Sequence, residues 1–439
     1  MTMIPPYPPH KRRPVRYFLS SLVIAALLFL GAAFSALAAN WPEFRGPTAD
    51  GLANVKNAPT KWSETDNIAW KTPLTGKAWS SPVIWGEQIW LTNAPPDGKE
   101  MRAICLDLAS GQIVHDIKLW DVAEPQFCYD LNSYASPTPV IEAGRVYVHF
   151  GVHGTACLDT TNGEIVWKRP PFDPELQCNH HRGPASSPIL HDNLLILTFD
   201  GFDQQYVVAL DKQSGQIAWR TDRNIDYGTD DGDAKKAYST PRVIMVDNQP
   251  QLISPSAGAV IAYDPRTGEE LWRVKCGGMN VSLRPLYAHG LLYNTTAAGG
   301  LQLFALKPRS HKPGEKAADL SDQVTWKQEK GASKRSSPII VGERIYMAGD
   351  DGILTCVNAL NGEVVWTKRV GGKFSASPVS AAGKIYFSDM EGQTYVLEPG
   401  DQYQELAVNT LSAGCMASPA VVEGGLILRT KEAVYRVGK

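Results

Sequence analysis

Residues 209–219 read Ala209-Leu210-Asp211-Lys212-Gln213-Ser214-Gly215-Gln216-Ile217-Ala218-Trp219, and this stretch decides the fold. An apolar run ends at an Asp, a short turn with Ser and Gly follows, and a second run carries a Trp. A glycine between two alternating runs is typical of a β-hairpin, because glycine adopts the positive φ that tight turns need. The pattern recurs as Asp159…Gly163…Trp167, Asp264…Gly268…Trp272 and Asn358…Gly362…Trp366.

A second mark of the repeat is a residue followed by Pro, at intervals of 40 to 55 residues. The eight dipeptides are Ser81-Pro82, Ser136-Pro137, Ser187-Pro188, Thr240-Pro241, Arg284-Pro285, Ser337-Pro338, Ser377-Pro378 and Ser418-Pro419. Two alternating runs follow each Pro before the hairpin motif, so each unit is predicted to have four antiparallel strands. Eight such units predict an all-β fold, an eight-bladed β-propeller.

The ring is expected to close through an N-terminal strand. The last unit ends at Lys439 after three strands, and Asn67-Ile68-Ala69-Trp70-Lys71 matches the missing Trp-bearing fourth strand. A linear solenoid would not need a detached strand at the opposite end of the chain. We therefore assign residues 67–439 to an eight-bladed propeller with four-stranded blades, and residues 40–66 to a lead-in segment.

The motif A-x-D-x-x-[ST]-G-x-x-x-W resembles the pyrroloquinoline quinone (PQQ) propeller repeat. That family includes quinoprotein dehydrogenases and the propeller lipoprotein of the outer-membrane assembly machinery. Trp41-Pro42-Glu43-Phe44-Arg45-Gly46-Pro47 resembles the segment that precedes such propellers in exported bacterial proteins. The resemblance implies that the repeat Trp docks between neighbouring blades, at Trp70, Trp167, Trp219, Trp272, Trp326 and Trp366. The first unit departs with His115, and the seventh departs around Glu398-Pro399-Gly400.

Composition excludes two classes of protein. Hydrophobic residues make up 43% and charged residues 20% of the 439, so the chain can bury a large core and is not disordered. The 43 Lys and Arg are balanced by 45 Asp and Glu, which argues against a nucleic-acid partner. We expect a monomer.

The first 39 residues are interpreted as a signal peptide. A basic start around Lys11–Arg16 precedes the apolar run Phe18–Phe34, and Ser35-Ala36-Leu37-Ala38-Ala39 offers a small-residue cleavage site. An uncleaved membrane anchor is the alternative, because residues 18–39 are long enough to span a bilayer. No Cys lies near the cleavage site, which argues against a lipid anchor. The expected location is periplasmic or secreted.

The loops that enter each blade are expected to form the mouth of the axial channel. The six residues before each repeat Pro contain several Lys and Arg and no Asp or Glu. Such a basic ring would attract an anionic ligand, although acid-poor strand entries could also arise from turn preferences. The candidate ligand-binding residues are Lys77, Trp79, Tyr134, Arg182, Lys236, Tyr238, Arg284, Arg335 and Lys373. We place Trp79, Tyr134 and Tyr238 at one repeat position, where they could stack on a flat ligand or simply pack.

A second group of polar residues falls in loops on the same face. His, Asp and Asn side chains from neighbouring loops could hold Ca²⁺ or another divalent metal, although polar loops often carry such residues without binding anything. The candidates are His153, His180, His181, Asp230, Asp231 and Asp233. The run Asp230–Asp233 lacks the full calcium-loop pattern. Cys128 and Cys178 lie in successive loops of one kind, so a disulfide between them is a hypothesis. The insertion Lys307–Asp322 is expected to be a solvated loop.

Three functions remain open from the sequence. The first is a binding or scaffolding propeller of the cell envelope, with an envelope protein, an anionic small molecule or a glycan as partner. The second, implied by the resemblance, is a PQQ-dependent dehydrogenase. Against that enzyme, the chain has no adjacent Cys pair and no C-x-x-C-H haem motif. The third is a metal-dependent glycan-binding propeller.

Overall fold

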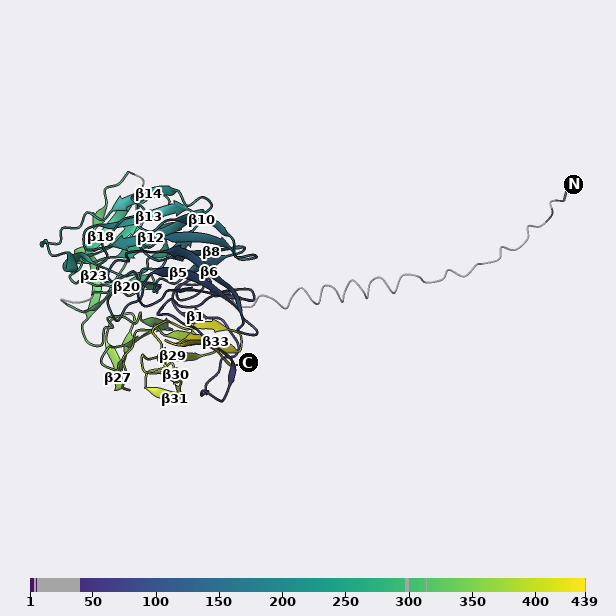
Figure 1. Ribbon diagram of the computed structural model, residues 1–439. Helices are drawn as coiled ribbons and strands as arrows, with labels where there is room; N and C mark the ends of the chain where they lie inside the picture. Colours follow the sequence, from purple (N-terminus) through teal and green to yellow (C-terminus); the bar gives the residue numbers. More distant parts are fainter. Residues whose placement is uncertain (4, 6–39, 297–299, 313, 439) are drawn as a thin grey trace. The chain divides into compact units, whose positions relative to one another are not determined.

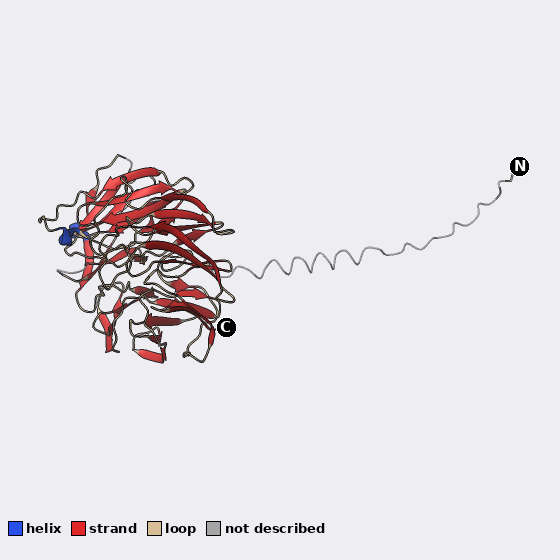
Figure 2. Cartoon of the chain, in the orientation of Figure 1, coloured by secondary structure: helices blue, strands red, loops and turns tan. Residues whose placement is uncertain are grey.

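The computed structural model describes residues 1–3, 5, 40–296, 300–312 and 314–438. The predicted signal peptide, residues 1–39, lies almost wholly outside this part of the chain. In this part of the chain, strands make up nearly all regular structure, and the helical turns are the short η1 (Gly232–Lys235) and η2 (Ser321–Gln323) (Figure 2). Within the described residues, no helix combines the length and apolarity that crossing a membrane requires.

Eight antiparallel sheets form the ring, so the predicted fold is confirmed (Figure 1). Blade 1 contains β3 (Val83–Trp85), β4 (Gln88–Asn93), β5 (Glu100–Asp107) and β6 (Ile113–Asp121), and blade 2 contains β7 (Val140–Glu142), β8 (Arg145–His149), β9 (Thr155–Asp159) and β10 (Ile165–Arg169). Blade 3 contains β11 (Ile189–His191), β12 (Leu194–Asp200), β13 (Gln205–Asp211) and β14 (Ile217–Asp222), and blade 4 contains β15 (Arg242–Val246), β16 (Gln249–Pro255), β17 (Ala259–Tyr263) and β18 (Glu270–Lys275).

The second half of the ring repeats the arrangement. Blade 5 contains β19 (Leu286–Ala288), β20 (Leu291–Thr295), β21 (Leu303–Leu306) and β23 (Val324–Gln328), and blade 6 contains β24 (Ile339–Val341), β25 (Arg344–Ala348), β26 (Ile353–Asn358) and β27 (Val364–Arg369). Blade 7 contains β28 (Val379–Ala381), β29 (Lys384–Ser388), β30 (Gln393–Glu398) and β31 (Gln404–Thr410). Blade 8 contains β32 (Ala420–Val422), β33 (Gly425–Arg429) and β34 (Ala433–Gly438).

The eighth blade is completed from the N-terminal side, as predicted. Strand β2 (Ile68–Pro73) pairs antiparallel with β34, with Ile68 opposite Val437 and Pro73 opposite Ala433. Trp70 then donates from its indole nitrogen to the Leu108 carbonyl of blade 1 at 3.0 Å. One strand therefore completes blade 8 and bonds it to blade 1, which closes the ring.

Two sheets gain a fifth strand. Strand β1 (Leu52–Ala53) pairs in parallel with β28, and β22 (Ala318–Asp319) pairs in parallel with β18 of blade 4. The prediction that Lys307–Asp322 is a solvated loop is wrong in this part. The insertion leaves blade 5 and packs over Trp272 on blade 4. Its Leu320 is fully buried, because this apolar side chain packs against the outer edge of the blade 4 sheet.

The geometry of the repeat explains the motif. Gly215 has φ of +72°, and a Cβ at this position would lie 2.6 Å from the Trp167 ring of the preceding blade. Trp167 also donates to the Lys212 carbonyl at 2.9 Å. Asp211 holds the turn by accepting hydrogen bonds from the Ser214 backbone and hydroxyl. Trp70, Trp219, Trp326 and Trp366 likewise donate to a carbonyl of the next blade.

Trp272 departs from the other repeat tryptophans. It donates to Gln251 within its own blade at 2.9 Å, because β22 lies where the next blade's turn would otherwise receive it.

Replacing Gly215 by alanine is expected to lower the free energy of unfolding by about 2–5 kcal/mol, from left-handed backbone strain plus overlap with Trp167. Gly144 is the matched control, since its φ is +77° but a Cβ there would meet nothing within 4 Å. Gly144→Ala should cost only about 1–2 kcal/mol. Urea denaturation followed by Trp fluorescence measures both. Equal losses in the two variants would show that the docked tryptophan contributes nothing to the glycine requirement.

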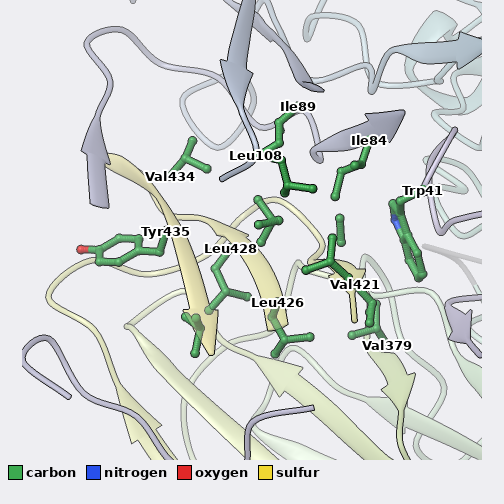
Figure 3. Packing of buried hydrophobic residues seen from close by; sticks show 14 of the residues in the cluster. Trp41, Ile84, Ile89, Leu108, Val379, Val421, Leu426, Leu428, Val434 and Tyr435 are labelled. Atoms are coloured by element: carbon green, nitrogen blue, oxygen red, sulfur yellow. The ribbon is translucent and has the colours of Figure 1, made fainter. Parts of the chain in front are cut away.

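The lead-in segment crosses the inner ends of the blades. Trp41 exchanges backbone hydrogen bonds with Ile84 of blade 1, Pro42 accepts one from Ile141 of blade 2, and Gly51 accepts one from Ser380 of blade 7. Figure 3 shows Trp41 beside Ile84 and Val421 in the buried cluster that joins blades 7, 8 and 1. The segment therefore runs across one end of the axial channel.

Candidate functional site

A ring of hydroxyl groups surrounds the axis where each blade begins. In seven of the eight blades, the backbone N–H at this position donates to the hydroxyl of the next blade, at 2.9–3.0 Å. The seven acceptors are Ser81, Thr138, Ser187, Thr240, Ser337, Ser377 and Ser418. The structure corrects the repeat position of blade 2 from Ser136 to Thr138, because β7 starts directly after Pro139. Arg284 holds the eighth position.

The ring forms the wall of an axial pocket with a volume of about 410 Å³. Six of the seven ring residues line it, all except Ser337. Phe44 of the lead-in segment also lines the pocket. The nearby residues Trp41 and Pro42 make backbone hydrogen bonds with Ile84 and Ile141, which lie on inner strands just after the ring residues. Phe44 therefore closes the pocket at the end where the lead-in segment crosses.

Four of the nine predicted ligand-binding residues line this pocket: Trp79, Arg182, Tyr238 and Arg335. All four lie in loops that lead into inner strands. Arg182 stacks its guanidinium 5.4 Å from the Tyr129 ring centroid, and Trp79 is fixed by donating to the Leu131 carbonyl at 3.2 Å. The pocket mouth therefore combines aromatic rings with positive charge.

The structure places the other five residues elsewhere. Lys77, Tyr134, Lys236, Arg284 and Lys373 are not among the lining residues. Tyr134 is buried and donates to the Gln126 carbonyl, and the blade 2 register shows that it does not occupy the repeat position of Trp79. Lys236 is fully buried against Asp233.

Arg284, the one candidate that directly precedes a repeat Pro, contacts the lead-in segment instead. Its guanidinium donates to the Glu43 carboxylate at 2.7 Å, to the Phe44 carbonyl and to the Pro241 carbonyl at 3.2 Å. The side chain is 2% exposed. All three guanidinium nitrogens have partners, so Arg284 holds the lead-in segment at the closed end of the pocket. The prediction that Arg284 faces the mouth is wrong.

The basic ring is also partly neutralised by carboxylates from other loops. Asp233 pairs with Arg182 at 2.9 Å, and hydrogen bonds from Lys236 and Arg182 lower the pKa of this carboxyl. Asp350, in the turn between β25 and β26, pairs with Arg335 at 2.9 Å and lines the pocket. A count limited to the six residues before each repeat Pro misses both groups, because Asp233 lies just before that window and Asp350 lies in the turn between β25 and β26.

Four further lining residues, whose side chains can form hydrogen bonds or carry charge, were not predicted from the sequence: Tyr129, Asn280, Ser282 and Asp350. The lining residues Arg182 (Nε), Asn280 (Oδ1), Arg335 (Nε) and Asp350 (Oδ1) also carry buried polar atoms without a partner among the described residues. Such atoms are uncommon in folded proteins unless water or a ligand pairs with them. The residues of the pocket wall therefore carry four polar atoms that a polar ligand could pair with.

Comparison with known proteins agrees with the fold. The family model PQQ_2, described as outer membrane protein assembly factor BamB, matches residues 53–202, 203–310 and 315–434. The chain belongs to this family. Quinohemoprotein alcohol dehydrogenase ADH-IIG of Pseudomonas putida is 26% identical over 153 residues, 33% of this chain and 20% of the enzyme. BamB of Legionella pneumophila (strain Paris) is 26% identical over 182 residues, 41% of this chain and 42% of that protein.

A solved structure shows the same architecture. BamB from Moraxella catarrhalis superposes with a TM-score of 0.59 at 14% identity, covering 84% of this chain and 99% of that chain. Identity this low shows a shared fold alone. The sequence matches span less than half of each of the two curated relatives. The relatives therefore include both a dehydrogenase and an assembly factor.

The six predicted metal ligands are not brought together in this PQQ_2 propeller. No group of three or more His, Cys, Asp or Glu side chains is placed to hold a metal within the described residues. His153 is buried between the Phe150 carbonyl and the Gln126 backbone N–H, and burial lowers its pKa to about 4. His181 is exposed beside Phe127 and Phe202. Asp230 and Asp231 are exposed, while Asp233 faces cations.

The seven cysteines of the PQQ_2 propeller are all free thiols, Cys128 and Cys178 included. The hypothesised disulfide between these two residues is therefore not formed in the structure. Cys105, Cys157 and Cys356 stand opposite the repeat His115, Trp167 and Trp366, as small core residues.

Proposed function

We propose that this protein is a binding propeller of the cell envelope whose axial pocket takes a small, flat anion. The observation that carries the proposal is the composition of the pocket wall. Arg182, Lys334 and Arg335 outnumber its single lining carboxylate, Asp350, and aromatic rings stand beside them. Positive charge in a concave site focuses anions, and aromatic side chains offer faces to a planar group.

The proposal predicts that benzene-1,3,5-tricarboxylate, a flat and redox-inert anion, binds the protein comprising residues 40–439. Arg335→Ala and Arg182→Ala should each weaken binding about tenfold or more, since each removes a hydrogen bond to a charged group. Isothermal titration calorimetry at two salt concentrations measures this, with weaker binding expected at high salt.

Arg344→Ala is the matched control, because Arg344 pairs with Asp401 away from the pocket and should leave binding unchanged. No binding by the unaltered protein, or equal binding by all three variants, would refute the pocket as an anion site. Export and periplasmic location remain part of the proposal. Fractionation of cells producing the full chain tests them.

A dehydrogenase of the quinoprotein kind is the second candidate, favoured by Asp350. Arg182, Lys334 and Arg335 would hold the three carboxylates of PQQ, whose quinone supplies two-electron oxidation chemistry. Oδ1 of Asp350 has no partner among the described residues and belongs to a side chain on the pocket wall, so it could accept a proton from a substrate hydroxyl. Alcohol-dependent dye reduction with added PQQ and Ca²⁺, lost in Asp350→Asn with PQQ binding retained, would select this candidate.

A further inference from the structure

The hydroxyl ring has a hydrogen-bonding asymmetry. Each of its seven oxygens accepts a backbone N–H from the preceding blade, at 2.9–3.0 Å. Every one of these residues is buried, with an exposed fraction of 1–4%. Within the described residues, none of the seven hydroxyls donates its own hydrogen to a protein acceptor. Six of the seven residues line the axial pocket, so their hydroxyl hydrogens remain available to a ligand there.

The serines that directly precede the ring behave differently. Ser186 donates to the Ser239 carbonyl at 2.8 Å, Ser239 donates to the Leu283 carbonyl at 2.6 Å, and Ser336 donates to the Ala376 carbonyl at 2.9 Å. These hydroxyls are satisfied between blades. The lack of a hydrogen-bond acceptor is therefore a property of the ring hydroxyls and not of every hydroxyl near the start of an inner strand.

We propose that the hydroxyl ring is a separate subsite for an oxyanion group, such as a carboxylate, phosphate or sulfate. It shares the axial pocket with the proposed function and in that respect rests on it. A buried hydroxyl hydrogen without an acceptor is costly, so the ring requires a partner that accepts hydrogen bonds. An oxyanion accepts at every oxygen, whereas a sugar hydroxyl would bring further hydrogens that need acceptors of their own.

The surroundings of the ring favour the same chemistry. The lining side chains carry three cations and one carboxylate, so the pocket has a net positive charge. Phe44 closes the pocket with an apolar ring that offers no acceptor to the hydroxyls. An oxyanion group entering from the mouth would thus meet Arg182 and Arg335 first and the hydroxyl ring at the deeper end.

A crystal of residues 40–439 soaked in selenate tests the subsite directly, because selenium is located by its anomalous scattering. We expect a peak within hydrogen-bonding reach of the Ser187 and Thr240 hydroxyls. A peak confined to Arg182 and Arg335 would overturn the ring subsite while leaving the proposed function standing. The absence of any peak in the pocket would also overturn the subsite.

Calorimetry with inorganic phosphate gives an independent measurement. Ser187→Ala should weaken phosphate binding about tenfold, since it removes one hydrogen bond to a charged acceptor. Ser186→Ala, which also removes one buried hydroxyl between blades, should bind phosphate unchanged. Arg335→Ala should retain phosphate binding within about twofold and weaken tricarboxylate binding about tenfold or more. Equal phosphate affinities of the two serine variants would refute the ring subsite, whatever the arginine variant shows.

Discussion

Replacing Arg223 by methionine is expected to lower the free energy of unfolding by about 3–5 kcal/mol. Arg223 and Asp200 form a two-pronged ion pair at 2.5 and 2.8 Å, and both side chains are fully buried. Arg223 also donates to the Ser254 hydroxyl at 2.9 Å, which ties blade 3 to blade 4. The substitution leaves the Asp200 carboxylate buried without a counter-ion. The shift of the urea midpoint measures the loss.

Two further variants separate charge from packing. The double variant Asp200→Asn/Arg223→Met should recover much of the loss, because no uncompensated charge remains. Arg344→Met breaks an ion pair whose Asp401 partner is exposed, and should cost no more than about 1 kcal/mol. A loss as large in Arg344→Met as in Arg223→Met would contradict the argument from burial.

Acidification is expected to destabilise the fold through three histidines in neighbouring loops and strands. Burial lowers the pKa of His149 to about 3 and the pKa values of His153 and His180 to about 4. In the unfolded chain the same three histidines titrate at about pH 6.5. Between these values the unfolded state binds more protons, so stability is greatest above about pH 6.5 and falls towards pH 4. Each histidine contributes up to about 1.4 kcal/mol per pH unit.

Urea denaturation at several pH values between 7 and 4 measures this slope. His153→Gln should make it shallower by up to about 1.4 kcal/mol per pH unit, since one buried proton acceptor is gone. His181→Gln is the control, because this imidazole is exposed on the loop that also carries His180. A slope that stays the same in His153→Gln would show that other groups cause the acid sensitivity.

The architecture could be predicted because it depends on local patterns. Asp211, Gly215 and Trp219 lie within one hairpin, and the same spacing recurs around the ring, so turn chemistry and strand alternation suffice to count the blades. The closing strand was predictable for the same reason, since Trp70 carries the pattern of a fourth strand. The blade 2 register was missed because Ser136-Pro137 and Thr138-Pro139 are equivalent as sequence and differ only in which hydroxyl receives the Ser81 backbone N–H.

The candidate site was predictable in part. Trp79, Arg182, Tyr238 and Arg335 line the pocket because they precede inner strands, and that position follows from the repeat. Arg284 instead holds the ring position itself, two residues further along the repeat, and turns to Glu43, a residue 241 positions away along the chain. Asp350 and Phe44 reach the pocket from a turn and from the lead-in segment, neither of which the repeat pattern places at the axis.

The sequence by itself determined the repeat, the strand count, the glycine turns and the route of ring closure, because each depends on neighbouring residues. Only the tertiary structure decided which cations remain available to a ligand, which carboxylates neutralise them and how the channel is closed. Those outcomes depend on side chains that meet across the axis from distant blades. Hydrogen-bond direction around the hydroxyl ring belongs to the same class, because each oxygen receives its N–H from a different blade.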